Sequence, residues 1–460
     1  MSAKLKPYPE YRDSGVDWLP RVPIHWEVVR SKRVFREVDD RGSDGTETHL
    51  AMSQKFGLVP SADLATKHTR SASYAGAKRC LPGDIVLNRL KAHLGVFARA
   101  NHQGVVSPDY TVLRSDGDIE PRYFEYTYRS TAFRGELRKS VKGIVEGFWR
   151  LYSADLGKLM VPAPPPEEQR WIADFLDAYA AQVHRLIAAK RRTIAALVER
   201  KQAIIDGMLG AGVVQNSGTV QHPVIGAIPA HWRVGRLKDW CEVNSRTLPE
   251  GTPGDYTFDY FDISAVGTGI LSGEPQAIAF DAAPSRARRR LAPNDILIST
   301  VRTYLKAIYF FRDWPRDAVA STGFAVLTPK SGVNPELLAY ALMTPRFIDV
   351  VISRSVGVAY PAIAETRLSA LHLALPPDES EQQLILNAIK TDTKLVDEAI
   401  AKERSQVDLI VEYRDSLIAA VVTGQLDVRE VAVRIVEGDD LADDTAADEE
   451  DMEDELDAID

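Results

Sequence analysis

The sequence predicts an α+β protein in which a mixed α/β domain followed by a long helix occurs twice in tandem. Short motifs recur in the same order at an offset of about 206–214 residues, so the chain contains an internal repeat. Two stretches carry apolar residues at steps of three and four, the spacing of one face of a helix. The length of 460 residues also exceeds what a single hydrophobic core normally organises. We therefore expect a pseudo-two-fold internal repeat.

Four pairs of motifs define the repeat. They are a Pro-x-His-Trp motif, a Pro-x-Asp motif before an apolar run, a Ser followed by a second apolar run, and a proline pair before Glu and Gln. The pairs lie at 22–28 and 228–234, 82–87 and 293–298, 106–113 and 320–327, and 164–169 and 376–382. Chance does not place four motifs in one order at nearly one offset. A unit of about 200 residues has been duplicated.

Short apolar runs bounded by Gly, Pro, Asn or Asp predict sheet strands within each copy. These runs lie at 84–87, 110–113, 296–299 and 324–327. The segments 121–134 and 335–351 each open with a proline suited to the first turn of a helix. Asp84 and Asp295 each stand in a turn before a strand, where an aspartate most often accepts hydrogen bonds from nearby backbone.

Each copy ends in a long amphipathic helix with a narrow apolar seam, the pattern of a coiled coil. About 42 residues would give a rod of roughly 60 Å. Gly207, Gly210 and Gly212 are expected to end the first helix, and Thr423-Gly424 the second. The predicted seam consists of Ile172, Leu176, Val183, Ile187, Ile194 and Leu197 in the first helix and Ile389, Val396, Ile400, Val407, Ile410 and Leu417 in the second.

A single helix of this length cannot bury such a seam alone, so each needs a partner. The economical partner is the other copy of the helix. The alternative is a dimeric scaffold in which each helix pairs with another chain. Periodicity does not show whether the paired helices run parallel or antiparallel.

The net charge of −9 is unevenly distributed. The segment 437–460 contributes fourteen negative charges and no positive ones, which leaves +5 on the preceding body. We interpret the acidic tail as a disordered solubilising extension, with a regulatory role as the alternative. A mildly basic body permits nucleic-acid binding without demonstrating it.

The chain shows no sign of secretion, membrane insertion or catalysis. It has no apolar run of about 18 residues and no secretory signal, so a cytoplasmic location is expected. The sequence contains no phosphate-binding P-loop, and its two cysteines and nine scattered histidines predict no metal site. Val266-Gly267-Thr268-Gly269 is interpreted as a turn rather than a cofactor loop, since no helix signal follows it. We expect no catalytic residues.

Basic and amide side chains gather at equivalent places in both copies, mainly just after the Pro-x-Asp strand. Arg and Asn can bond base edges, and Lys suits phosphates. The alternative is an ordinary solvated basic face. The candidate DNA-binding residues are Lys67, Arg70, Lys78, Arg79, Asn88, Arg89, Lys91, His93, Lys142 and Arg150 in the first copy, and Arg286, Arg288, Arg289, Arg290, Arg302, Thr303, Tyr304, Lys306, Arg354 and Tyr360 in the second.

This arrangement resembles the specificity (S) subunit of type I restriction–modification systems, an HsdS-like chain. The resemblance is carried by residues 11–19 with Pro23–Trp26, by Pro82-Gly83-Asp84, by the two Pro-Pro-x-x-Glu-Gln helix starts and by 416–429. It covers about residues 8–430, so the acidic tail departs from the family pattern.

The resemblance implies two target-recognition domains whose long helices form an antiparallel coiled coil that acts as a ruler. The implied organisation is an N-terminal segment at 1–19, target-recognition domain 1 at 20–163, spacer helix 1 at 164–210, a linker at 211–224, target-recognition domain 2 at 225–375, spacer helix 2 at 376–425 and a C-terminal extension at 426–460.

The resemblance also implies partners and a target. The family reads a bipartite DNA sequence, and because the two recognition domains differ outside the shared motifs, we expect unlike half-sites. Two modification (M) subunits and restriction (R) subunits are the implied protein partners. S-adenosylmethionine, ATP and Mg are expected in those subunits, with no cofactor in this chain. Two rivals are a fused methyltransferase–nuclease and a coiled-coil adaptor with no role on DNA.

Overall fold

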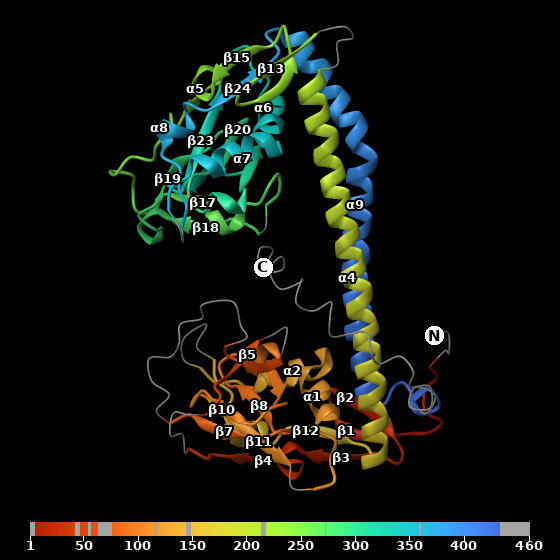
Figure 1. The fold of residues 1–460 in the computed structure, drawn as a ribbon. Helices are drawn as coiled ribbons and strands as arrows, with labels where there is room; N and C mark the ends of the chain where they lie inside the picture. The colour runs from red at the N-terminus through yellow and green to blue at the C-terminus, as the bar shows by residue number, and fades with distance from the viewer. Residues whose placement is uncertain are drawn as a thin grey trace. The chain divides into compact units, whose positions relative to one another are not determined.

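The protein divides into two compact units (Figure 1). The computed structural model describes residues 5–41, 47–53, 57–62, 76–115, 117–143, 149–212, 218–271, 273–357 and 360–432. Within these residues, unit 1 comprises the chain up to Lys190 and again from Ser405, and unit 2 comprises Arg191–Arg404. The acidic tail at 437–460 lies outside the described residues.

Unit 1 is built on a four-stranded antiparallel sheet in the order β4-β11-β8-β9. Four two-stranded sheets, β1-β2, β5-β6, β7-β10 and β3-β12, accompany it. The elements are β1 (Tyr11–Val16), β2 (Leu19–Pro23), β3 (Glu27–Arg30), η1 (Ser31–Arg33), β4 (Phe35–Val38), β5 (Leu50–Ser53), β6 (Gly57–Pro60), β7 (Lys78–Cys80), β8 (Ile85–Asn88), η2 (Ala92–Leu94), β9 (Phe97–Arg99), β10 (Gly104–Val106), β11 (Tyr110–Ser115), α1 (Pro121–Arg129), α2 (Thr131–Ser140), α3 (Ser153–Leu156) and β12 (Met160–Ala163).

Unit 2 repeats this plan with the sheet β16-β23-β20-β21. A second four-stranded sheet, β18-β17-β22-β19, and the pairs β13-β14 and β15-β24 complete it. The elements are β13 (Thr219–His222), β14 (Gly226–Pro229), β15 (Arg233–Arg236), α5 (Leu237–Trp240), β16 (Cys241–Val243), β17 (Thr257–Phe261), η3 (Ile263–Ala265), β18 (Gln276–Ala279), η4 (Phe280–Ala282), β19 (Ala287–Arg290), β20 (Asp295–Ser299), η5 (Thr303–Leu305), β21 (Ile308–Phe311), β22 (Ala318–Ser321), β23 (Phe324–Pro329), α6 (Pro335–Leu342), α7 (Pro345–Arg354), α8 (Glu365–Leu368) and β24 (His372–Leu375).

The central strand of each main sheet is buried on both faces. Side chains alternate between the faces of a strand. In β20, Ile296 and Ile298 therefore join the core formed with α6 and α7, whereas Leu297 joins the core beneath the second sheet. In β8, Ile85 and Leu87 contact the core that contains α1 and α2. This double burial explains why both strands are continuous apolar runs in the sequence.

The Pro-x-Asp turns behave as the sequence predicts. Asp84 is buried and accepts a hydrogen bond from the Leu81 N–H at 2.8 Å. Its carboxylate also pairs with Arg114 on β11 at 2.6 Å. Asp295 repeats the backbone contact with the Ala292 N–H at 2.8 Å. The two aspartates therefore close turns and anchor strands.

The two long helices, α4 (Pro166–Ala211) and α9 (Glu379–Val422), pack against each other in both units (Figure 1). In unit 1 the beginning of α4 shares a core with the end of α9, where Ile172 and Leu176 meet Leu417. In unit 2 the end of α4 shares a core with the beginning of α9, where Ile205 meets Ile385. The helices therefore run antiparallel, and the predicted fold class of two mixed domains with a paired coiled coil is confirmed.

All residues of the predicted seam are buried or half-buried. The buried ones are Ile172, Leu176, Val183, Ile187, Ile389, Val396, Ile400 and Leu417. Ile194, Leu197, Val407 and Ile410 are half-buried. Two paired helices that no third surface covers leave part of a seam residue open to solvent.

A buried carboxylate ties each domain to the start of its long helix. Glu168 accepts hydrogen bonds from the Tyr8 hydroxyl at 2.5 Å and His25 Nε2 at 2.8 Å. In unit 2, Glu381 binds His231 Nε2 at 2.9 Å and the Trp232 indole N–H at 3.1 Å. Burial, and then the hydrogen bond to Glu168, raise the pKa of Tyr8, so its hydroxyl stays a donor.

The glutamine that follows each carboxylate ties the same helix start to a second helix. The side-chain Oε1 of Gln169 accepts a hydrogen bond from the Glu120 N–H at 3.0 Å, immediately before α1. The side-chain Oε1 of Gln382 accepts one from the Asn334 N–H at 2.7 Å, immediately before α6. The Glu-Gln pair of the repeated motif thus fixes how each domain meets its helix.

The end of each long helix packs on the Pro-x-His-Trp turn, which is Pro23–Trp26 in unit 1 and Pro229–Trp232 in unit 2. Gly424 and Gly212 follow the two helices with φ of +71° in both cases. A Cβ at Gly424 would lie 2.5 Å from Pro23 Cδ, so only glycine fits there. The prediction that Gly207 and Gly210 also end the first helix is wrong: α4 continues through both, because only Gly212 adopts the left-handed conformation that ends a helix.

Replacing Glu168 with Ala should lower the free energy of unfolding by about 1–3 kcal/mol, because it leaves the buried Tyr8 hydroxyl without an acceptor. Thermal or urea unfolding measures the change. The control is Glu167→Ala at the exposed neighbouring position, which should change stability by less than about 0.5 kcal/mol. Equal effects of the two substitutions would contradict the assigned role of Glu168.

Candidate nucleic-acid interface

In unit 2, the loop after β20 lies beside a short hairpin. The loop carries the 3₁₀ turn η5, and the hairpin is closed by the Val356–Ala362 bridge. The two are joined by a Val301–Ala362 bridge and by the Ile363 N–H, which donates to the Thr300 carbonyl at 2.8 Å. The exposed side chains of this loop and hairpin are called surface 2 and comprise Arg302, Tyr304, Leu305, Lys306, Arg354, Val356 and Tyr360.

Unit 1 places a loop and a hairpin together in the same way. The loop after β8 carries the 3₁₀ turn η2, and the hairpin is closed by the Lys142–Arg150 bridge. The Leu151 N–H donates to the Arg89 carbonyl at 3.1 Å. The exposed or half-exposed side chains here are called surface 1 and comprise Leu90, Lys91, His93, Leu94, Lys142, Trp149 and Arg150.

Both surfaces combine basic groups with exposed aromatic and aliphatic side chains. Trp149 meets His93 edge to face at a ring separation of 5.0 Å, and Tyr360 lies beneath the Arg302 guanidinium at 5.1 Å. Exposed apolar groups can contact thymine methyls and sugars, while basic groups contact phosphates and guanine. Each surface therefore combines side-chain types that can contact phosphates with types that can contact base edges.

The backbone of surface 2 is strained at two basic residues. Arg302 and Lys306 have φ of +50° and +52°, in the left-handed region that non-glycine residues rarely adopt. The other non-glycine residues with positive φ in the described chain are Asn244 and Asn294, and asparagine tolerates this conformation. In unit 1 the position equivalent to Lys306 is Gly95. Because glycine would fit this conformation better, we expect the Lys306 side chain to have a role of its own.

The candidates near β7 and β8 in unit 1 mostly make structural contacts. Lys78 is only 2% exposed and lies 3.5 Å from Asp39, so it is not placed to reach DNA. Arg89 donates to the Asp109 carbonyl at 2.7 Å and so holds a neighbouring turn. The Asn88 side chain accepts from the Leu90 N–H at 3.1 Å and caps its own loop.

The remaining unit 1 candidates lie at the surface with differing charge environments. Arg79 pairs with Glu47, and Arg150 with Asp109. Lys142 pairs with Asp155 at 2.6 Å. Burial, and then the nearby Arg138, lower the pKa of His93, which makes it neutral at neutral pH. Lys91 is exposed. Lys67 and Arg70 lie outside the described residues.

The arginines around β19 in unit 2 are largely engaged with neighbouring side chains. Arg286 pairs with Asp262 at 2.7 Å, and Arg289 lies 3.7 Å from Glu365. The Arg288 guanidinium stacks on Phe280 at 4.9 Å. Arg290 is exposed.

Thr303 is buried and its hydroxyl donates to Ser355, so this candidate positions the loop and does not face outward. Arg302, Tyr304, Lys306, Arg354 and Tyr360 are all exposed. No Asp or Glu occurs in residues 299–307 or 353–364. Surface 2 is therefore positively charged without local neutralisation from its own loop and hairpin.

Sequence reasoning missed the exposed apolar residues of both surfaces, namely Leu90, Leu94, Leu305 and Val356. A signal was present, since apolar residues alternate with basic ones just after the strand. Apolar residues are more often buried than exposed, so only the structure shows these side chains at the surface.

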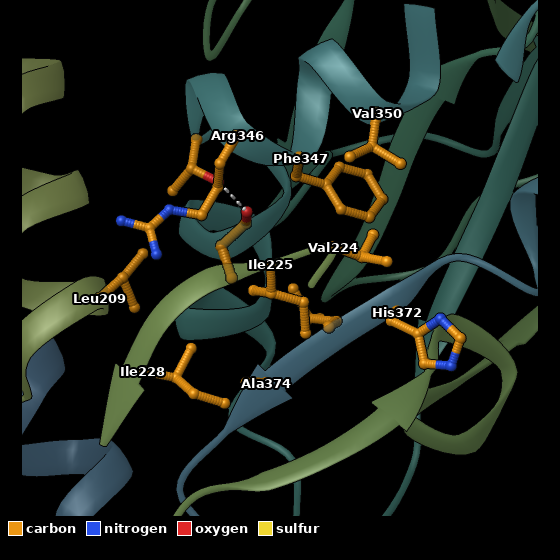
Figure 2. Close-up of a pocket in the computed structure, with 12 residues that line it drawn as sticks. Leu209, Val224, Ile225, Ile228, Arg346, Phe347, Val350, His372 and Ala374 are labelled. Atoms are coloured by element: carbon orange, nitrogen blue, oxygen red, sulfur yellow. Dashed lines mark hydrogen bonds between the residues drawn. The ribbon is translucent and has the colours of Figure 1, made fainter. Parts of the chain in front are cut away.

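A small pocket lies in unit 2 between the end of α4, the β13-β14 hairpin and α7 (Figure 2). Its walls are mainly apolar and include Leu209, Ile225 and Phe347, with Arg346 at its edge. The cavity of about 30 Å³ has room for about one water. Arg346 is occupied by Asp206 at 2.9 Å. This pocket offers neither the space nor the free polar groups that a cofactor requires.

The described residues include neither a metal-binding cluster nor a readily ionised thiol. Among the described residues, no group of three or more His, Cys, Asp or Glu side chains could hold a metal ion. Burial raises the pKa of the Cys80 thiol to about 12, and likewise that of Cys241, so neither forms a thiolate nucleophile at neutral pH. Val266–Gly269 forms part of a tight turn in which the Gly267 N–H donates to the Ile270 carbonyl. Within the described residues, no helix is long and apolar enough to cross a membrane.

The structure is that of two mixed α/β units built on a pair of long helices, and comparison with known proteins gives its family. The family model for the type I restriction modification DNA specificity domain matches residues 25–195 and again residues 229–407. The chain belongs to this family. It is a specificity subunit of the type I restriction–modification class, which recognises DNA and carries no catalytic activity of its own.

Two individual proteins are similar over most of the chain. A Methanocaldococcus jannaschii protein named as a type I restriction enzyme MjaX specificity subunit is 23% identical over 371 residues, which cover 76% of this chain and 80% of the relative. A chain from a solved structure on complex assembly and conformational transition of the type I R-M system matches with a TM-score of 0.56 at 17% identity. That match covers 88% of this chain and 99% of the other, and it supports the fold.

Replacing Lys306 with Gly should maintain or raise the free energy of unfolding, by up to about 1 kcal/mol, because glycine relieves the left-handed strain. The substitution should also weaken DNA binding and reduce the salt dependence of the DNA affinity by the amount expected for about one phosphate contact. The control is Lys306→Ala, which removes the same charge but keeps the strain. Equal unfolding free energies of the two variants would contradict the backbone strain at Lys306. An unchanged dependence of DNA affinity on salt concentration would contradict the phosphate contact.

Proposed function

We propose that this chain reads a bipartite, asymmetric DNA target, with one half-site contacted by each recognition domain. The observation that carries the proposal is that the same loop-and-hairpin arrangement occurs in both units with different side chains. Shared backbone contacts place the two surfaces on equivalent elements. Because Lys91 before the 3₁₀ turn in unit 1 corresponds to Arg302 in unit 2, and His93 corresponds to Tyr304, the two surfaces should read different bases.

The paired helices are proposed to set the spacing between the two half-sites. Each recognition domain is fixed to one helix start by a buried carboxylate and glutamine and to one helix end by a glycine. Such contacts leave little freedom at the junctions, so the number of residues in the helices would determine the spacing. DNA presents the same groove again after one turn, about 34–36 Å along its axis. A fixed distance between the two recognition domains therefore selects a fixed number of base pairs between the two half-sites.

We further propose that modification subunits, two per chain, and restriction subunits dock on this chain. They would bring S-adenosylmethionine, ATP and Mg, and this chain would bind no cofactor. A cytoplasmic location would fit this role. The organisation into two target-recognition domains at 20–163 and 225–375 remains a prediction.

Two rival functions make different predictions. A fused methyltransferase–nuclease would bind labelled S-adenosylmethionine as an isolated chain. A coiled-coil adaptor without a role on DNA would support full activity of a partner complex after deletion of both domains. The buried aspartates of the Pro-x-Asp turns disfavour the enzyme, because their carboxylates are engaged by the turn and by an arginine.

Methylome sequencing of a host with and without this chain tests the proposal. The expected result is the loss of one divided adenine-methylation motif when the chain is removed. The two halves of that motif should differ in sequence. An unchanged methylome, in a host whose modification subunit is expressed and active, would refute the proposed function.

Shortening both helices by one heptad tests the role of the coiled coil. Removing 184–190 from α4 and 407–413 from α9 keeps the seam in phase, because Lys190 lies opposite Gln406 at 2.6 Å. The rod becomes about 10 Å shorter, so the preferred spacer should shorten or the motif should be lost.

The control deletes the heptad from α4 alone, which should misalign the seam and destabilise the protein. Circular dichroism and thermal unfolding would show that the double deletion still folds. If the folded double-deletion variant still directs methylation of the original motif with its original spacer, the helices do not set the spacing between the half-sites.

A further inference from the structure

Arg302 and Tyr360 form a cation–π pair within surface 2. The Arg302 guanidinium carbon lies 5.1 Å from the centroid of the Tyr360 ring, within the range of a cation–π contact. Both residues are exposed, and the Tyr360 side chain keeps 66% of its accessible surface. Stacking uses the face of the guanidinium and leaves its N–H edge available for hydrogen bonds.

We infer that Arg302 reads a guanine in the half-site of unit 2 and that Tyr360 is the positioning residue that holds Arg302 flat for this contact. The inference rests on the proposed function of the chain as a DNA reader. A guanidinium can bond the O6 and N7 atoms of guanine together, and this bidentate contact requires a defined orientation in the major groove. Tyr360 supplies that orientation without forming a hydrogen bond to the N–H groups of the Arg302 guanidinium.

Other arginines of unit 2 are less suited to this contact. Arg286 is bound by Asp262, Arg289 lies beside Glu365, and Arg316 is bound by Asp259. Each would have to break an ion pair to meet a base. The loop and hairpin around Arg302 contain no acidic residue at all.

The hairpin that carries Tyr360 is held in place by its backbone. Gly357 has φ of +119°, and a Cβ there would lie 3.0 Å from the Tyr360 carbonyl oxygen. The Val356–Ala362 and Val301–Ala362 bridges join the hairpin to the loop that carries Arg302. Tyr360 and Arg302 are therefore presented on two connected segments.

The backbone of Arg302 adds a second constraint on the position of its guanidinium. Arg302 adopts φ +50° and ψ +50°, a conformation costing about 1 kcal/mol for a non-glycine residue. The backbone conformation of Arg302 and the contact of its guanidinium with the Tyr360 ring together restrict the guanidinium to a narrow set of orientations.

The experiment measures methylation motifs in a host that expresses the full chain with its modification partner. The variants are Arg302→Lys, Tyr360→Leu and Tyr360→Phe. Arg302→Lys and Tyr360→Leu should relax the same single G·C position in one half-site, with discrimination reduced on the order of 10–100-fold. Tyr360→Phe should keep the motif, because the phenyl ring still supports the guanidinium.

Arg312→Lys is the matched control. Arg312 also stacks on an aromatic ring of unit 2, Phe310 at 5.5 Å, but it lies outside surface 2. This control should leave the motif unchanged. Thermal unfolding of each variant shows whether it folds, and the high exposure of Tyr360 predicts that its replacement does not disturb the core.

The outcomes separate this inference from the proposed function. If the unmodified chain specifies no divided motif, the proposed function itself fails. If a motif exists but Arg302→Lys lowers methylation at all sites without relaxing one position, Arg302 contacts phosphate and the inference is overturned. Relaxation at an A·T position, or a Tyr360→Leu variant with the original motif, would also overturn it.

Discussion

In both units a buried glutamate at the start of a long helix accepts hydrogen bonds from the Pro-x-His-Trp turn of the domain. A carboxylate removed from water must be fully satisfied, so it tolerates few arrangements of the groups around it. Glu168 and Glu381 therefore define where each domain sits on its helix start. The neighbouring glutamine adds a second fixed contact, to the N-terminus of α1 or α6. The geometry of each unit depends on these contacts.

Each junction between a domain and the start of one long helix also includes the end of the other long helix. In unit 1 the Tyr123 hydroxyl donates to the Val422 carbonyl at 3.0 Å, and Gly424 fits against Pro23. In unit 2, Gly212 occupies the equivalent place beside Pro229. Each domain is thus held by the start of one helix and the end of the other. An antiparallel pair of helices is the arrangement that meets this requirement in both units.

The two surfaces show how a shared frame can carry different chemistry. The sheet, the 3₁₀ turn and the hairpin are equivalent, and their contacts are made mainly by backbone atoms and buried side chains. The exposed positions are free to differ, as Gly95 and Lys306 do at one equivalent site. Because base readout depends on the exposed side chains, such a frame can change its target without changing its fold.

The sequence by itself determined the duplication and the two mixed domains with long helices, whereas the antiparallel pairing of the helices was implied only by the resemblance to the family. Apolar periodicity marked the helices, and Pro-x-Asp marked the turns, because these signals arise from local geometry that each segment carries with it. The sequence also located the loop of each surface. It could not separate Arg302 from Lys78, since both are basic residues close to a strand.

Tertiary structure decided which candidate side chains are available. Lys78 is buried beside two acidic residues, Arg89 holds a turn, and Thr303 faces Ser355. These partners lie up to about fifty residues away in the chain, so no local sequence pattern predicts them. Likewise, the pairing of Arg302 with Tyr360 exists only because two loops meet through backbone bridges. Local sequence specifies the elements, whereas the availability of a charge depends on which distant groups the fold places beside it.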